Sequence, residues 1–132
     1  MPSASKHETK AASNRRFLDG FRDTTTAADW AAVVAFYTAV HLVERIRALE
    51  NDHSRDHQYR NEYILRNHRI IHADFHGLYN VSLLARYESN DKFYKQLTPE
   101  QVWTVLVDQY LLRIEEYVKE FCSKNTTKPS TT

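Results

Sequence analysis

The most apolar long segment of the chain spans residues 26–49, and its pattern is typical of a helix packed by neighbours on several sides. Thr26 followed by Asp29 is similar to a capping box, which predicts the start of a helix. One face carries Val33, Phe36, Val40 and Val43, and the adjoining face carries Trp30, Val34, Tyr37, His41, Glu44 and Ala48. We expect this segment to be the central helix.

Four further segments show helical signals. A first helix is predicted over residues 6–19, a short third helix from about Asp56, and a fourth helix over residues 70–88. The last helix has the most complete start signal, because Thr98 is a suitable N-cap, Pro99 occupies the first helical position, and Gln101 follows three residues after the cap.

Glycine and proline are scarce, with two and three residues in a chain of 132, so little material exists for hairpins. The sequence therefore predicts an all-α, up-and-down bundle of four to five helices. We expect a single domain over residues 6–122, with residues 1–5 and 123–132 disordered. Gly77 inside the fourth helix costs about 1 kcal/mol relative to alanine, which predicts close approach of another backbone there, such as the central helix.

Composition narrows the function mainly by exclusion. The chain has no apolar run of the roughly 20 residues that span a bilayer and no signal-peptide core, so we expect a cytoplasmic protein without membrane contact. Cys122 is the only cysteine, which excludes an internal disulfide and a cysteine-based zinc site. Too few glycines are present for a phosphate-binding loop, and we expect no cofactor.

The basic residues are distributed unevenly, although the formal net charge is only +1. Residues 11–91 contain ten arginines and no lysine. Arginine's planar fork suits phosphate or carboxylate, so one interpretation is contact with an anion or an RNA backbone. The other is codon usage combined with ordinary surface ion pairs.

Six of the seven histidines lie between His41 and His76. Histidines one helical turn apart, such as His53 and His57, can both reach a metal ion, but a zinc site needs three or four ligands. No HExxH motif is present. Histidines on the surface or at helix ends explain the pattern more simply, and we predict no metal site.

An arginine followed by a histidine can serve metal-free RNA cleavage, because a base must take the ribose 2′-proton and a cation must stabilise the phosphorane. Arg66 and His72 have suitable spacing, and Asn67 follows the arginine. Random placement would give roughly two such pairs in a chain of this composition, so the spacing alone has little specificity.

Three segments together resemble HEPN-like helical proteins of bacteria and archaea. The central helix carries Phe36, Tyr37 and then His41, and a polar stretch carries His57, Arg60 and Asn61. The fourth helix ends in Ala85, Arg86 and Tyr87. The resemblance covers residues 28–87 and depends on the order and spacing of these pieces.

The resemblance implies a helical bundle, frequent homodimerisation, and roles in toxin–antitoxin or defence systems. Active members are ribonucleases whose motif is an arginine, a polar residue and a histidine, which Arg66, Asn67 and His72 match. In this chain the motif lies before or at the start of the fourth helix, which is a different position from that in the active members.

A non-catalytic role is the alternative, and it is the one we expect. His41 and Glu44 could form a polar binding pocket with His57 and Arg60, or a satisfied pair in the core, and Arg86 is a further binding candidate. We therefore predict a binding module that contacts a protein partner such as an antitoxin, a nucleotide or RNA, and we keep a metal-independent endoribonuclease as the second hypothesis.

Overall fold

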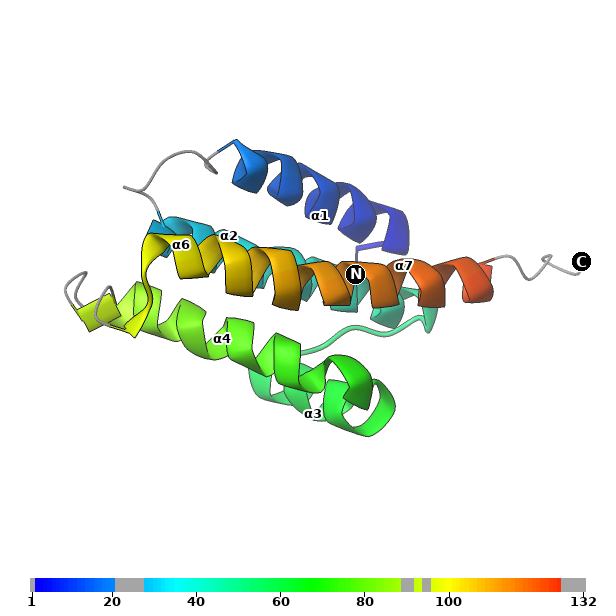
Figure 1. The fold of residues 1–132 in the computed structure, drawn as a ribbon. Helices are drawn as coiled ribbons and strands as arrows, with labels where there is room; N and C mark the ends of the chain where they lie inside the picture. The colour runs from blue at the N-terminus through cyan, green and yellow to red at the C-terminus, as the bar shows by residue number, and fades with distance from the viewer. Residues whose placement is uncertain (1, 21–27, 89–91, 94–95, 127–132) are drawn as a thin grey trace, which may run out of the picture.

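The computed structural model describes residues 2–20, 28–88, 92–93 and 96–126, and these form a bundle of helices (Figure 1). The principal elements are α1 (Ala4–Asp19), α2 (Ala28–Leu49), α3 (His57–Asn67), the 3₁₀ turn η1 (Arg69–Ile71) and α4 (His72–Tyr87). The chain then continues as α6 (Pro99–Gln101), the π-helical segment η2 (Val102–Leu111) and α7 (Leu112–Thr126). No strand occurs in the described part, so the predicted all-α class is confirmed.

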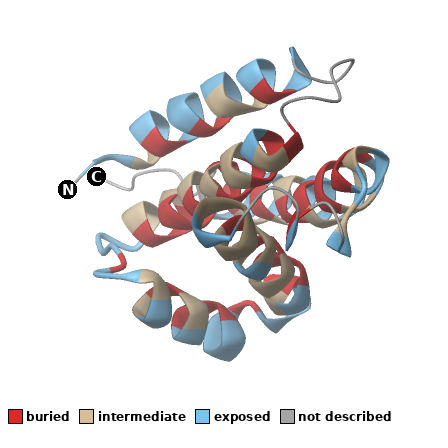
Figure 2. Ribbon diagram, turned by 90° about the vertical axis from the view of Figure 1, so that its left-hand side faces the viewer, coloured by how far each residue is buried: buried red, intermediate tan, exposed pale blue. Residues whose placement is uncertain are grey.

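The helix α2 is central, as predicted. It packs against α1, α4, η2 and α7, and Figure 2 shows its buried residues along most of its length. Thirteen of its residues are buried, among them Phe36, Val43 and Ile46. Trp30 differs from the expected pattern because 64% of its surface is exposed. The proposed cap at Thr26 lies outside the described residues.

Element boundaries follow local signals where these exist. Ser3 caps α1 through its hydroxyl, so α1 begins at Ala4, two residues earlier than expected. The capping box at Thr98 is confirmed, since the Thr98 hydroxyl accepts the Gln101 N–H and the Gln101 side chain accepts the Thr98 N–H. The last helix extends to Thr126, beyond the expected end at residue 122.

The close approach at Gly77 comes from a side chain of the last helix. A Cβ built at Gly77 would lie 2.8 Å from a ring carbon of Tyr110. The prediction of an approaching backbone from the central helix is therefore wrong, and the missing side chain accommodates an aromatic ring in η2 instead. This contact fixes the packing of α4 against the last helix.

The apolar core joins residues from every principal helix, including Leu18, Phe36, Ile64, Phe75, Leu106 and Ile114. None of the helices in the described part of the chain combines the length and the apolarity needed for a membrane span.

Candidate functional site

Polar side chains gather where Ser54, the buried residue of the segment between α2 and α3, lies against α2. Glu44 on α2 is buried, and its Oε2 accepts the Nε–H of Arg60 at 3.0 Å while its Oε1 accepts the Ser54 N–H at 2.8 Å. Arg60 also donates from Nη1 to Nδ1 of His57 at 2.8 Å. We call Glu44, Ser54, His57 and Arg60 the Glu44 cluster.

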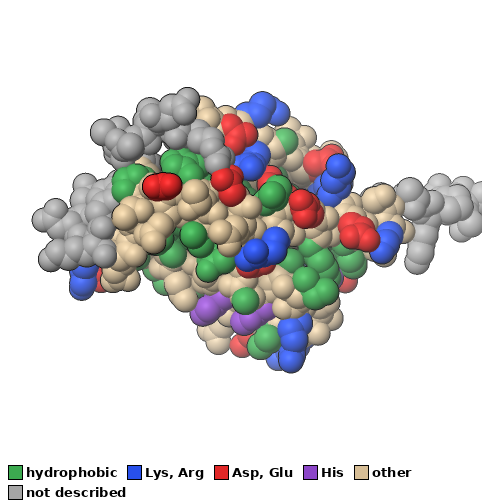
Figure 3. Space-filling model, in the orientation of Figure 1, with side chains coloured by type: hydrophobic (Ala, Val, Ile, Leu, Met, Phe, Trp, Pro, Cys, Tyr) green, Lys and Arg blue, Asp and Glu red, His purple; other side chains and the backbone are tan. Residues whose placement is uncertain are grey.

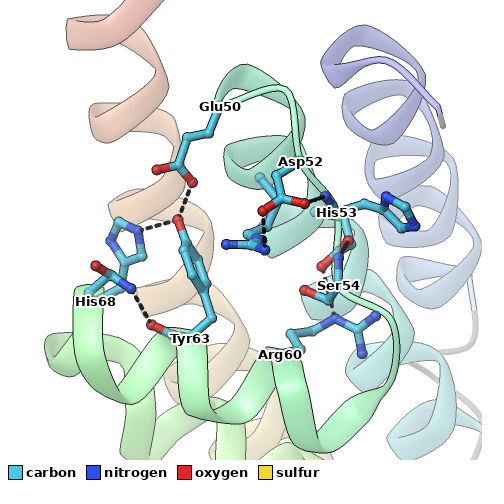
Figure 4. A network of polar contacts seen from close by, with 10 residues as sticks. Glu50, Asp52, His53, Ser54, Arg60, Tyr63 and His68 are labelled. Carbon is cyan, nitrogen blue, oxygen red and sulfur yellow. Dashed lines mark hydrogen bonds and ion pairs between the residues drawn. The ribbon is translucent and has the colours of Figure 1, made fainter.

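The start of α3 places two members of this cluster. The Asp56 carboxylate accepts the Tyr59 N–H at 2.7 Å and so begins the helix immediately before His57. His57 and Arg60 then lie one turn apart and on the same side. Figure 4 shows Ser54 on the segment that precedes α3 and the Arg60 side chain pointing from α3 towards it. The expected meeting of Glu44 with His57 and Arg60 is thus present.

His41 has a different main partner from the one the sequence suggested. Its Nδ1 lies 3.0 Å from Nδ1 of His7 on α1, so one ring nitrogen donates and the other accepts. Burial lowers the pKa of both histidines, and for His41 the neighbouring His7 lowers it further. The pair therefore joins α1 to α2 in its neutral form. The clustering of histidines did not predict a role for His7, because His7 lies far in sequence from the other six.

Arg86 is held by its own helix and by α2. Its Nε donates to the Ser82 carbonyl at 3.2 Å, and its Nη1 donates to the Tyr37 hydroxyl at 2.9 Å. Beside it, the rings of Phe36, Tyr37, His57 and Tyr79 form an aromatic cluster with centroid separations of 5.2 to 6.4 Å. Burial, Arg60 and Arg86 lower the pKa of His57. Ring contacts and the Arg86 hydrogen bond therefore join the three segments on which the family resemblance depends: Phe36 and Tyr37 on α2, His57 on α3 and Arg86 on α4.

A second polar network was not foreseen. The Tyr63 hydroxyl donates to Glu50, and Nε2 of His68 lies 3.0 Å from the same hydroxyl (Figure 4). Nδ1 of His68 lies 2.6 Å from the Tyr117 hydroxyl. Since the proton of Tyr63 points to Glu50, Nε2 of His68 donates to Tyr63 and Nδ1 accepts from Tyr117. Burial lowers the pKa of His68, which agrees with this neutral ring.

Next to this network lies a hollow of about 330 Å³ between the end of α2 and the outer side of α3. We call it the Arg47 hollow, and it is lined by Arg47, Tyr59, Glu62, Tyr63, Arg66 and Asn67. The guanidinium of Arg47 lies 4.0 Å from the centre of the Tyr63 ring and donates to Asp52 at 2.8 Å. Its Nε–H is buried without an acceptor among the described residues.

The three residues of the ribonuclease motif have separate partners. The exposed Arg66 lies 4.0 Å from Glu62, and Asn67 donates to the Tyr63 carbonyl at 3.1 Å. His72 stacks on His76 with ring centres 5.7 Å apart, and histidines are visible over α4 in Figure 3. Asp74, on the same helix as His72, accepts two hydrogen bonds from Arg113.

The described residues contain no group of three or more His, Cys, Asp or Glu side chains arranged to hold a metal ion. Among the histidines spaced one turn apart, His72 and His76 stack on each other, whereas His57 contacts Arg60 and His68 contacts two tyrosines. Comparison with protein families, with curated proteins and with solved structures finds no match for the chain.

Proposed function

We propose that this chain is an HEPN-like helical binding module that contacts RNA or a nucleotide, in a toxin–antitoxin or defence context in the cytoplasm. The observation that carries the proposal is that Arg66 and His72 have different partners. A general base and a phosphate-binding cation must act on one phosphate at the same time, so their side chains have to meet at one open site. In this chain Arg66 borders the Arg47 hollow, whereas His72 stacks on His76.

The Glu44 cluster supports a structural role for the residues that the resemblance singles out. Glu44 and Arg60 are both at least 90% buried and are bonded to each other and to Ser54 or His57. A buried pair whose hydrogen bonds are satisfied fixes the packing of α3 on α2 and leaves no open group for a reaction. We propose that the outer surface of α3 binds the ligand. The Glu44 cluster then has the structural role of holding α3 against α2.

A metal-independent endoribonuclease is the second candidate. The order Arg66, Asn67, His72 favours it, as does the partial exposure of His72. Burial, His76 and Arg69 lower the pKa of His72, so the ring is neutral near pH 7 and able to accept a proton. A second copy of the chain, which the family resemblance implies, would have to supply the missing partner for this chemistry.

The deciding experiment measures binding and cleavage of mixed-sequence RNA in the presence of EDTA. We expect a retarded complex and intact RNA with both the native chain and His72→Ala. Cleavage that survives the chelator and falls by about 10²-fold or more in His72→Ala would favour the endoribonuclease, since that is the usual effect of losing a general base. Light scattering in the same buffer tests the homodimer.

A further inference from the structure

The Arg47 hollow is a concave surface where a buried arginine, an exposed arginine and tyrosine rings meet. Its volume of about 330 Å³ is within the range of small-ligand sites. Two tyrosines and an amide line it together with the two arginines, so it offers both stacking surface and hydrogen-bonding groups. These features suit a ligand that has an aromatic group at one end and an anionic group at the other.

Arg47 supplies a cation that its own surroundings only partly satisfy. Its surface is 5% exposed, yet its one carboxylate partner in the described network, Asp52, has a side chain that is 54% exposed. Its Nε–H has no acceptor in the part of the chain that the structure describes. A buried guanidinium with an unsatisfied donor is a costly arrangement, and an anion seated above it would lower that cost.

Arg66 at the rim is free to change partner. Its side chain is 77% exposed and lies at 4.0 Å, the outer limit of an ion pair, from a Glu62 side chain that is 51% exposed. Exposed pairs of this kind contribute little, so a phosphate group can replace Glu62 at small cost. Arginine also matches a phosphate with two parallel hydrogen bonds, which Glu62 does not receive at this distance.

The wall of the hollow suits a nucleobase. Tyr59 offers a ring that the guanidinium groups of Arg47 and Arg55 already approach, at 5.4 and 4.9 Å from its centre. Stacking of bases on aromatic rings beside arginine is a common mode of nucleotide recognition. The amide of Asn67 donates to the Tyr63 carbonyl, which leaves its Oδ1 as an acceptor for a base amino group.

We propose that the Arg47 hollow binds a nucleoside 5′-monophosphate, with the phosphate on Arg66 above the charge of Arg47 and the base against Tyr59 and Asn67. This proposal rests on the proposed function, because it names the ligand of a binding module and its site. Glu62 competes with the phosphate for Arg66 and therefore limits the affinity of the native chain.

Isothermal titration with adenosine 5′-monophosphate tests the site, and adenosine and inorganic phosphate serve as partial ligands. We expect the monophosphate to bind more tightly than either partial ligand. Arg66→Gln should weaken its binding about tenfold or more, the usual effect of losing a charge-assisted hydrogen bond. Glu62→Gln should strengthen binding by roughly two- to fivefold, because the competing carboxylate is gone.

Lys124→Gln is the matched control, since Lys124 forms an exposed pair with Glu120 at the same helical spacing but on α7. It should leave the affinity unchanged, and circular dichroism should show that all variants are folded. Equal affinity for inorganic phosphate and the monophosphate would overturn the nucleotide assignment. Monophosphate binding that is absent, or that Arg66→Gln leaves intact, would overturn the site. RNA binding by the native chain in that event would leave the proposed function standing.

Discussion

Two buried arginines lie close to the segment that joins α2 to α3, and they differ in how they are satisfied. Arg60 faces Glu44, whose side chain is 6% exposed, and it also bonds to His57. Arg47 faces the half-exposed Asp52, and its Nε–H finds no acceptor among the residues that the structure describes. Burial alone therefore does not separate the two arginines, but the exposure of the carboxylate partner does.

The largest loss of stability is expected at the Arg60–Glu44 pair, because both of its side chains are buried. Arg60→Met leaves the Glu44 carboxylate buried without its cation and should lower the free energy of unfolding by about 3–5 kcal/mol. Urea denaturation measures this loss. The double variant Arg60→Met with Glu44→Gln removes both charges and should recover much of it. A loss below about 1 kcal/mol in the single variant would show that the pair is not structural.

The same substitution at the other arginine should have a smaller effect. Arg47→Met keeps an apolar side chain against the Tyr63 ring and leaves Asp52 able to be solvated, so we expect a loss of about 1 kcal/mol or less by urea denaturation. Nucleotide binding should weaken in this variant even though the fold is kept. A loss as large as that of Arg60→Met would remove the distinction between the two arginines.

The histidine pair beside the Glu44 cluster predicts a dependence on pH. The pKa values of His7 and His41 are lowered in the folded chain, so protons bind more readily when α1 is detached. The docking of α1 is therefore complete above the ordinary pKa of about 6.5 and weakens as pH falls below it. The other charged or titratable groups around the pair are Lys10 on α1, Glu44 on α2, His53 in the connecting segment and Arg60 on α3.

Hydrogen exchange of α1 amides, corrected for the intrinsic effect of pH, measures this docking. We expect protection to fall between pH 7 and pH 5.5 by up to about tenfold, equivalent to ~1.4 kcal/mol. His7→Gln can still form a hydrogen bond with His41 but removes one of the two titratable groups. It should therefore flatten the dependence of protection on pH. An unchanged slope in that variant would assign the pH dependence to another histidine.

The fold was largely predictable because its signals are local. The cap at Thr98 and the periodicity of α2 depend on residues close together in the sequence, and the scarcity of glycine and proline can be counted directly. The partner of Gly77 could not be predicted in this way, since Tyr110 is distant in sequence and reaches the glycine only through the packing of two helices.

The candidate site was predictable only in part. Glu44, His57 and Arg60 were expected to meet, because a short connection joins their helices. The bridge from His68 to Tyr117 spans 49 residues and has no local signal. His7 could have been noticed, since it lies one turn before the buried Ala11 on the face that α1 buries.

The different directions of Arg66 and His72 have a backbone cause. An unbroken helix through both residues would fix their relative direction, with His72 about 120° around the axis from Arg66. Instead α3 ends at Asn67, His68 adopts φ −140° and ψ 51°, and a 3₁₀ turn precedes α4. The break reorients the chain between the two residues, and sequence spacing cannot reveal that change of direction.

The contact between Gly77 and Tyr110 also specifies the register of two helices. The ring occupies a notch that exists at only one level along α4, because Gly77 is the only glycine in that helix. A shift of α4 by one turn would present Ala73 or Val81 to the ring, and each has a Cβ where Gly77 has none. The notch therefore favours one register of α4 against the last helix, although their apolar surfaces would otherwise allow similar alternatives.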